Sequence, residues 1–205
     1  MRRTLSFSAA IAIVVCSAGP APADDFADCV GKSPDPSIRG CSNLLKQEWR
    51  SSEFLGAVYL KRGGSYSRIG QYDRAIADYD KAIILGARLV PALTDRGAAY
   101  LAKGQYDRAI ADYDKAIKLN PRNVQGHTGR GLSYQLSGQH DKAIADFSEA
   151  IPFGPRYSFL YFNRAMAYEK IGQSDKAISD YQQMLKINPH NQSSMAALKR
   201  LGAAP

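Results

Sequence analysis

Four arginines and four aspartates are the charged residues with the most regular spacing in this sequence. The arginines recur at one constant interval, and an aspartate follows each of them at a second constant interval; the pairs are Arg62 and Asp78, Arg96 and Asp112, Arg130 and Asp146, and Arg164 and Asp180. A planar guanidinium can hold a carboxylate through two parallel hydrogen bonds. The spacing therefore predicts one structural ion pair in each repeated unit. The alternative interpretation is a row of arginines that binds an acidic ligand.

No set of residues has the spacing of a catalytic centre or a metal site. His127, His140 and His190 are far apart, and no two of them have the spacing that places metal ligands on one helix face. The sequence lacks a Gly-x-Ser-x-Gly motif, a phosphate-binding glycine loop and a dinucleotide-binding fingerprint. We therefore expect a protein that is not an enzyme and that uses no cofactor and no metal.

The N-terminal residues have the pattern of a secretory signal peptide. Two arginines precede a mostly apolar stretch over residues 5–15, and Ala21-Pro22-Ala23 has the small-x-small form of a cleavage site. This pattern predicts a signal peptide over residues 1–23, cleaved after Ala23, and a periplasmic or secreted mature protein. The alternative is a buried N-terminal helix.

The cysteines support the same compartment. Cys16 lies within the expected signal peptide, so Cys29 and Cys41 remain as an even pair. Disulfides persist in oxidising compartments, and we expect one between these two residues. It would contribute about 2–3 kcal/mol by the chain-entropy estimate. The alternative is two free buried thiols.

The four arginines and four aspartates lie in a 34-residue repeat. The string GQYDRAIADYDKAI at 70–83 occurs unchanged at 104–117, and related strings occupy 138–151 and 172–185. In 104–117 the apolar residues lie at i, i+3, i+4 and i+7, which predicts an amphipathic helix, and 93–101 predicts a second, shorter one. Each unit is therefore expected to contain two antiparallel helices.

Small residues mark where the two helices of a unit should cross. Gly97 and Ala109 would let the helix axes approach closely, and Tyr100 and Tyr113 would fill the space around that contact. Proline lacks an N–H and clashes with the preceding turn, so Pro152 should end its helix about a turn early.

With this unit length and its G-x2-Y…A-x3-F/Y…A…P pattern, the chain resembles the tetratricopeptide repeat (TPR) family, in particular its secreted bacterial members. The resemblance covers four units, at 56–89, 90–123, 124–157 and 158–191. It implies an all-α fold, a right-handed α-solenoid of helix–turn–helix units. Ala87, Ala165 and Met184 depart from the pattern without being expected to alter the fold.

A stacked repeat needs caps, because an end unit cannot bury both of its faces. Residues 24–55 are expected to form a degenerate N-terminal helical unit tied by the Cys29–Cys41 disulfide. Residues 192–205 are expected to form a C-terminal capping helix and a short tail.

The resemblance also implies a concave face, lined by the first helix of each unit, that binds another polypeptide. Helical spacing predicts that this groove contains Leu60, Gly64, Ser67 and Arg68 from the first unit, Thr94, Ala98 and Leu101 from the second, Thr128, Leu132 and Gln135 from the third, and Phe159, Phe162, Met166 and Glu169 from the fourth.

Two details of this groove bear on its ligand. Phe159, Phe162 and Met166 would be the strongest anchors for a peptide, unless they pack as core. Family members that hold the acidic C-terminus of heat-shock chaperones use lysines and asparagines at such places. Only Lys61 and Asn163 lie near them here, so we do not expect that clamp.

Composition limits the remaining classes of function. The 205 residues are 45% hydrophobic and 22% charged, which excludes a disordered chain. The net charge is +8, and +6 once the two arginines of the expected signal peptide are removed. No apolar run reaches the roughly 18 residues of a membrane span. Because no basic run has interleaved aromatics, nucleic-acid binding is the weakest hypothesis.

We therefore expect a non-catalytic scaffold that binds a peptide segment or partner helix in the cell envelope. An assembly or secretion chaperone with transient clients is the alternative. The sequence leaves the partner's identity and the oligomeric state open.

Overall fold

The computed structural model describes residues 22–47 and 51–204, and this part of the chain is helical throughout. Its elements are α1 (Pro22–Val30), α2 (Pro34–Leu44), α3 (Ser52–Arg68), α4 (Tyr72–Ile84), α5 (Leu89–Ala102), α6 (Tyr106–Leu119), α7 (Val124–Leu136), α8 (His140–Ala150), the 3-10 helix η1 (Ile151–Phe153), α9 (Ser158–Lys170), α10 (Ser174–Ile187) and α11 (Gln192–Arg200). The signal peptide expected at 1–23 lies outside the described residues, except that Pro22 and Ala23 begin α1.

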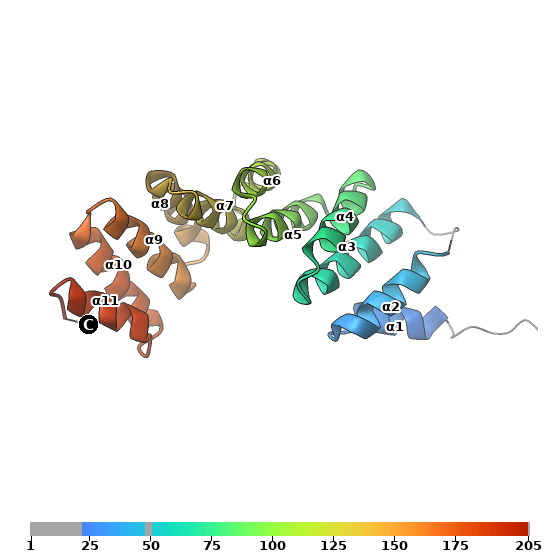
Figure 1. The fold of residues 1–205 in the computed structure, drawn as a ribbon, viewed down its shortest axis with the longest axis horizontal. Coiled ribbons are helices and arrows are strands. Elements are labelled where there is room, and N and C mark those ends of the chain that lie inside the picture. The colour runs from blue at the N-terminus through green and yellow to red at the C-terminus, as the bar shows by residue number, and fades with distance from the viewer. Residues whose placement is uncertain (1–21, 48–50, 205) are drawn as a thin grey trace, which may run out of the picture.

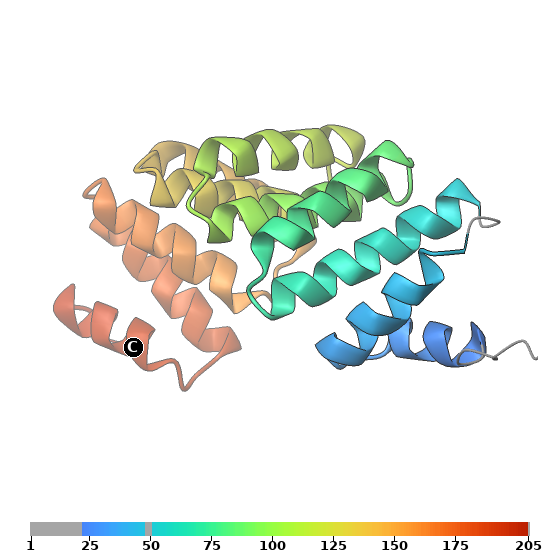
Figure 2. The same ribbon diagram turned by 45° about the vertical axis from the view of Figure 1, so that its right-hand side comes forward.

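Consecutive helices pack in antiparallel pairs, and the pairs stack into an arch. Each helix from α1 to α10 packs on the next, and α5 also contacts α3 and α7 in the neighbouring pairs. Figure 1 shows α6 at the top of the arch and α1 and α11 at its two ends; Figure 2 shows the same arrangement turned by 45° about the vertical axis. The predicted all-α solenoid fold is confirmed.

A glycine in the left-handed region makes the turn inside each unit. Gly70, Gly104, Gly138 and Gly172 have φ between +70° and +82°. The N–H of the residue after the glycine then bonds to a carbonyl of the preceding helix, as in Gln105 N to Tyr100 O at 2.9 Å. This geometry satisfies carbonyls at the end of the first helix and reverses the chain.

The helices of a unit cross where the first helix carries a glycine and the second an aromatic residue. A Cβ on Gly97 would lie 3.0 Å from the Tyr113 ring, and one on Gly131 would lie 2.9 Å from the Phe147 ring. Ala109 is fully buried beside this contact. The aromatic ring therefore occupies the space that a larger residue would need.

Proline shortens the second helix of the third unit. α8 has 11 residues and ends at Ala150, whereas α6 in the preceding unit has 14. The chain continues from α8 as the 3-10 turn Ile151–Phe153, with Pro152 at its start. The early end follows from the missing N–H of proline.

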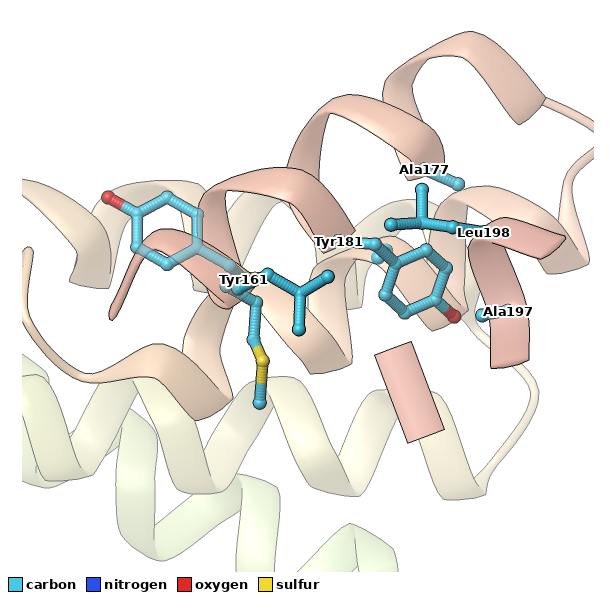
Figure 3. Packing of buried hydrophobic residues seen from close by; sticks show 8 residues of the cluster. Tyr161, Ala177, Tyr181, Ala197 and Leu198 are labelled. Carbon is cyan, nitrogen blue, oxygen red and sulfur yellow. The ribbon is translucent and has the colours of Figure 1, made fainter. Parts of the chain in front are cut away.

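Additional helices cover both ends of the stack. At the N-terminus, α1 and α2 are joined by the Cys29–Cys41 disulfide, which packs in a cluster with Leu44 and Val58. At the C-terminus, α11 covers α10. Figure 3 shows Ala197 and Leu198 of α11 beside Ala177 and Tyr181 of α10.

Candidate interaction groove

Each of the four arginines lies against the aspartate that the sequence pairs with it. Nε and Nη2 of the arginine donate to the two carboxylate oxygens; the distances are both 2.7 Å for Arg62–Asp78 and for Arg96–Asp112. They are 2.9 and 2.6 Å for Arg130–Asp146 and 2.7 and 2.8 Å for Arg164–Asp180. The aspartates are buried. Each pair ties the two helices of one unit.

The third nitrogen of each arginine reaches the preceding unit. Nη1 of Arg96 donates to Asp80, and Nη1 of Arg130 donates to Asp114. Arg62 and Arg164 reach hydroxyls instead, on Ser42 at 3.0 Å and Ser148 at 2.9 Å. The predicted ion pairs did not include these second acceptors, although Asp80 and Asp114 occupy equivalent positions in successive units.

Because their nitrogens already donate to protein oxygens, these arginines are poor candidates for binding an acidic ligand. The aspartate hydrogen bonds are also the main cause that raises the pKa of all four guanidinium groups. The guanidinium carbon of Arg62 also lies 5.5 Å from the ring centroid of Tyr59 and 5.8 Å from that of Tyr66, within the range of a cation–π contact. The structural interpretation of the arginine row therefore fits the geometry.

A histidine joins one of these pairs. His127 is buried, its Nδ1 lies 3.4 Å from Asp146 Oδ1 and its Nε2 lies 3.0 Å from the carbonyl oxygen of Pro121. Both ring nitrogens face acceptors, and only the protonated ring can donate from both. The hydrogen bond to Asp146 is the main cause that raises the pKa of His127.

The residues predicted for the groove differ in how much surface they offer to a ligand. Thr94 and Thr128 are only 4% and 9% exposed. The Thr94 hydroxyl donates to the carbonyls of Val90 and Pro91 in its own helix, which turns it away from solvent. The prediction that these two threonines line the groove is therefore wrong. The other twelve are at least partly exposed.

Phe162, Met166 and Glu169 of α9 meet in a pocket of about 450 Å³ at the C-terminal end of the stack. α10 and α11 complete this pocket, whose other lining residues are Lys170, Tyr181, Ser193, Ala197 and Arg200. Phe162 also packs edge-on against the Tyr181 ring, with centroids 5.8 Å apart. Phe162 and Met166 are thus partly core and partly pocket wall. Phe159 is 42% exposed and is not among the residues that line this pocket.

A polar cluster closes one side of this pocket. Tyr181 Oη donates to Glu169 at 2.6 Å, and Arg200 of α11 holds the same carboxylate, with Nη1 2.9 Å from Oε2 and Nη2 3.1 Å from Oε1. Burial, followed by this hydrogen bond, raises the pKa of Tyr181. Arg200 was not among the predicted groove residues, because no pattern within the repeats indicates that the capping helix contacts α9.

A second pocket, of about 330 Å³, lies between α3 and the first half of α5, toward the N-terminal end of the stack. It contains three predicted residues, Leu60, Gly64 and Arg68, together with Ala57, Lys61, Arg88 and Asp95. Leu101, Leu132 and Gln135 line neither this pocket nor the C-terminal one. Each pocket therefore contains three of the predicted groove residues, and the N-terminal pocket is the more strongly cationic of the two.

The described part of the chain has neither a cluster of potential metal ligands nor a helix that could span a membrane. Residues 22–47 and 51–204 hold no group of three His, Cys, Asp or Glu side chains placed to bind a metal ion. None of the helices in these segments is both long and apolar enough to span a membrane.

Solved structures with the same fold include TPR proteins. MamA is 28% identical, with a TM-score of 0.68 over 76% of this chain and 89% of that one. YrrB, a TPR protein with an unusual peptide-binding site, is 19% identical, with a TM-score of 0.68 over 81% of this chain and 84% of that one. The first TPR domain of Spaghetti (RPAP3), bound to the HSP90 peptide SRMEEVD, is 26% identical, with a TM-score of 0.54 over 55% of this chain and 90% of that one.

Sequence comparison agrees with the fold. A family profile described as TPR repeat matches residues 97–138, and two described as tetratricopeptide repeat match residues 56–83 and 158–191. Together the three matches cover about half of the chain. No curated protein matches it in sequence. The 34-residue units, the stacked helix pairs and these matches together show that the chain belongs to the tetratricopeptide repeat family.

Proposed function

We propose that this protein is a non-catalytic scaffold that binds a segment of another protein along the concave side of its arch. The observation that carries the proposal is the pair of pockets at the two ends of that side, lined by predicted groove residues on α3 and α9. Such pockets can accept the side chains of an extended peptide or an amphipathic helix. The peptide bound by the 26% identical Spaghetti domain supports the same use of the fold.

We also place this function outside the cytoplasm. The Cys29–Cys41 disulfide supports an oxidising compartment, because reducing compartments keep most thiols free. The signal-peptide pattern at 1–23 points the same way. A periplasmic or secreted scaffold is therefore the proposal.

Capture of partners by the immobilised mature chain tests this proposal. We expect one partner in near-stoichiometric amount, and we expect Phe162→Ala to release it because Phe162 forms a wall of the C-terminal pocket. Phe153→Ala is the matched control, since Phe153 is 45% exposed in η1 and lies outside that pocket. Circular dichroism of both variants shows whether the fold is kept.

Three outcomes decide against the scaffold. Many substoichiometric clients would favour the chaperone. Retention of nucleic acid alone, with steep salt dependence, would contradict both protein-binding hypotheses. Equal loss of the partner in both phenylalanine variants would show that binding does not use the concave side.

A further inference from the structure

We propose that the pocket at the N-terminal end of the concave side binds the carboxylate of an acidic side chain in the peptide ligand. This inference rests on the proposed function, because it names the chemistry of one ligand residue in the same groove. It uses Lys61, Arg68 and Arg88, of which only Arg68 was predicted to face the groove.

Positive charge is concentrated in this pocket. Three of its seven lining residues, Lys61, Arg68 and Arg88, are cationic, and Asp95 is its only acidic one. Opposite charges attract, and several cations gathered around one hollow attract an anion more strongly than a single cation does. A ligand that brings one negative charge therefore fits the pocket better than a neutral or positive one.

Unlike the repeat arginines, two of these cations have no partner among the described residues. Lys61 and Arg88 make no side-chain hydrogen bond or ion pair with any residue in 22–47 or 51–204. Arg68 is held in place, since Nη1 donates to the carbonyl oxygen of Lys32 and Nη2 to Ser65 Oγ at 3.0 Å. One fixed cation and two unpaired ones can converge on an incoming carboxylate.

The combination of Lys61 and Arg68 on the first helix occurs in the first unit only. At the positions equivalent to Lys61, the second, third and fourth units have Asp95, Gly129 and Asn163. At the positions equivalent to Arg68 they have Ala102, Leu136 and Lys170. The repeat architecture therefore does not require cations at these two positions.

A glycine leaves room for the ligand in front of these cations. A Cβ added to Gly64 would meet no atom within 4 Å, whereas one on the adjacent Gly63 would lie 2.7 Å from the Tyr79 ring. Packing within the protein explains Gly63 but not Gly64. Glycine inside a helix is otherwise unfavourable, and it commonly marks a close approach of another backbone.

The backbone conformation of Arg88 is a second unusual feature of this pocket. Arg88 is the N-cap of α5 and the only described non-glycine residue with a positive φ, at +47°. The left-handed conformation is strained for a non-glycine residue, and such conformations are found mainly at active sites and ligand-binding sites. Here this conformation accompanies an exposed guanidinium at the mouth of the pocket.

The remaining lining residues favour a peptide over a small inorganic anion. Ala57 and Leu60 add an apolar wall that suits the methylenes of a glutamate side chain. Asp95 on α5 can accept a hydrogen bond from a peptide N–H, and it opposes a second negative charge. The expected ligand residue is therefore a single glutamate or aspartate within a peptide.

Titration of the mature chain with an N-acetylated, C-amidated tetraglutamate peptide tests this inference. Two-dimensional NMR at low salt should show amide shifts centred on Gly64 and Asp95, and tetraglutamine should produce none. Lys61→Gln combined with Arg88→Gln should weaken binding at least tenfold. Gly64→Leu should abolish it by filling the open space, and its unfolding curve checks that the fold is kept.

Arg122→Gln is the matched control, because Arg122 occupies the position of Arg88 in the next unit and does not line this pocket. The inference is overturned if Arg122→Gln weakens binding as much as the double variant, which would indicate general charge attraction. It is also overturned if tetraglutamine binds equally, or if inorganic phosphate alone gives the same shifts at the same concentration.

Failure of the carboxylate-site inference can be distinguished from failure of the scaffold proposal. If a partner is captured and Phe162→Ala releases it, while tetraglutamate does not bind, the groove function stands and only the carboxylate site is wrong. If no partner depends on the concave side, the scaffold proposal itself fails.

Discussion

At the scale of single residues, the charged positions divide into two groups. The repeat arginines donate to buried aspartates and stabilise the fold, whereas Lys61 and Arg88 have no such partner among the described residues and line the N-terminal pocket. The first group was predictable because it recurs in every unit together with its aspartates. The second was not, because its members come from different elements and lie near one another only after α3 and α5 pack.

Removing one repeat arginine should strongly destabilise the fold. Arg164→Leu leaves Asp180, which is 5% exposed, as a buried charge without its cation. Breaking such a pair costs about 3 kcal/mol, and replacing both partners with apolar residues restores much of that loss. Urea unfolding of Arg164→Leu and of Arg164→Leu combined with Asp180→Leu measures this. A single variant that is as stable as the wild type would contradict the account.

His127 should make the stability depend on pH. Its pKa in the folded state is raised above the usual 6.5, so its contribution is fully present below pH 6.5 and is lost as the pH rises through the folded value. The free energy of unfolding of the wild type, relative to His127→Phe, should therefore fall as the pH is raised above 6.5. Urea unfolding of both proteins over a pH series measures this difference. A difference that stays constant or grows with pH would refute it.

At the scale of elements, the repeat pattern predicted the helices well because each unit has the same two apolar stripes and the same turn glycine. It predicted the groove less well. Helical spacing places Thr94 and Thr128 on the concave side, but both are buried there. Spacing gives the direction of a side chain from its own helix and does not show how far the neighbouring helices cover it.

Two adjacent glycines of α3 should respond to alanine in opposite ways. Gly63→Ala places a Cβ 2.7 Å from the Tyr79 ring and should destabilise the fold by about 1–3 kcal/mol. Gly64→Ala meets no neighbour and should stabilise it by about 0.5–1 kcal/mol, because glycine is the poorer helix former. Thermal and urea unfolding of the two variants give both values. The same sign of change in both would show that the crossing is not packed as described.

At the scale of the whole molecule, the protein is a linear stack in which each unit contacts its neighbours. In such stacks a local change affects nearby units most. The Cys29–Cys41 disulfide joins α1 and α2 at one end, far along the chain from α9–α11. The disulfide could be predicted from the sequence, because only two cysteines remain after the expected signal peptide. The ion pair between Arg200 of α11 and Glu169 of α9, at the other end, could not.

Removal of the disulfide should therefore loosen one end of the arch. We expect Cys29→Ser combined with Cys41→Ser to lower the free energy of unfolding by about 2–3 kcal/mol. Hydrogen exchange should accelerate in α1 and α2, and remain unchanged in α9–α11, because α9–α11 lie at the opposite end of the arch from the N-terminal pair (Figure 1). Uniform acceleration along the chain would contradict a local role for the disulfide.

Site-specific photo-crosslinking tests the central claim, that the concave side holds another polypeptide, most directly. A photoreactive residue at Met166, in the wall of the C-terminal pocket, should form an adduct with a partner protein, and one at Leu119, exposed at the end of α6, should not. Adducts from Met166 alone are the predicted result. Adducts from Leu119 with none from Met166 would contradict the account.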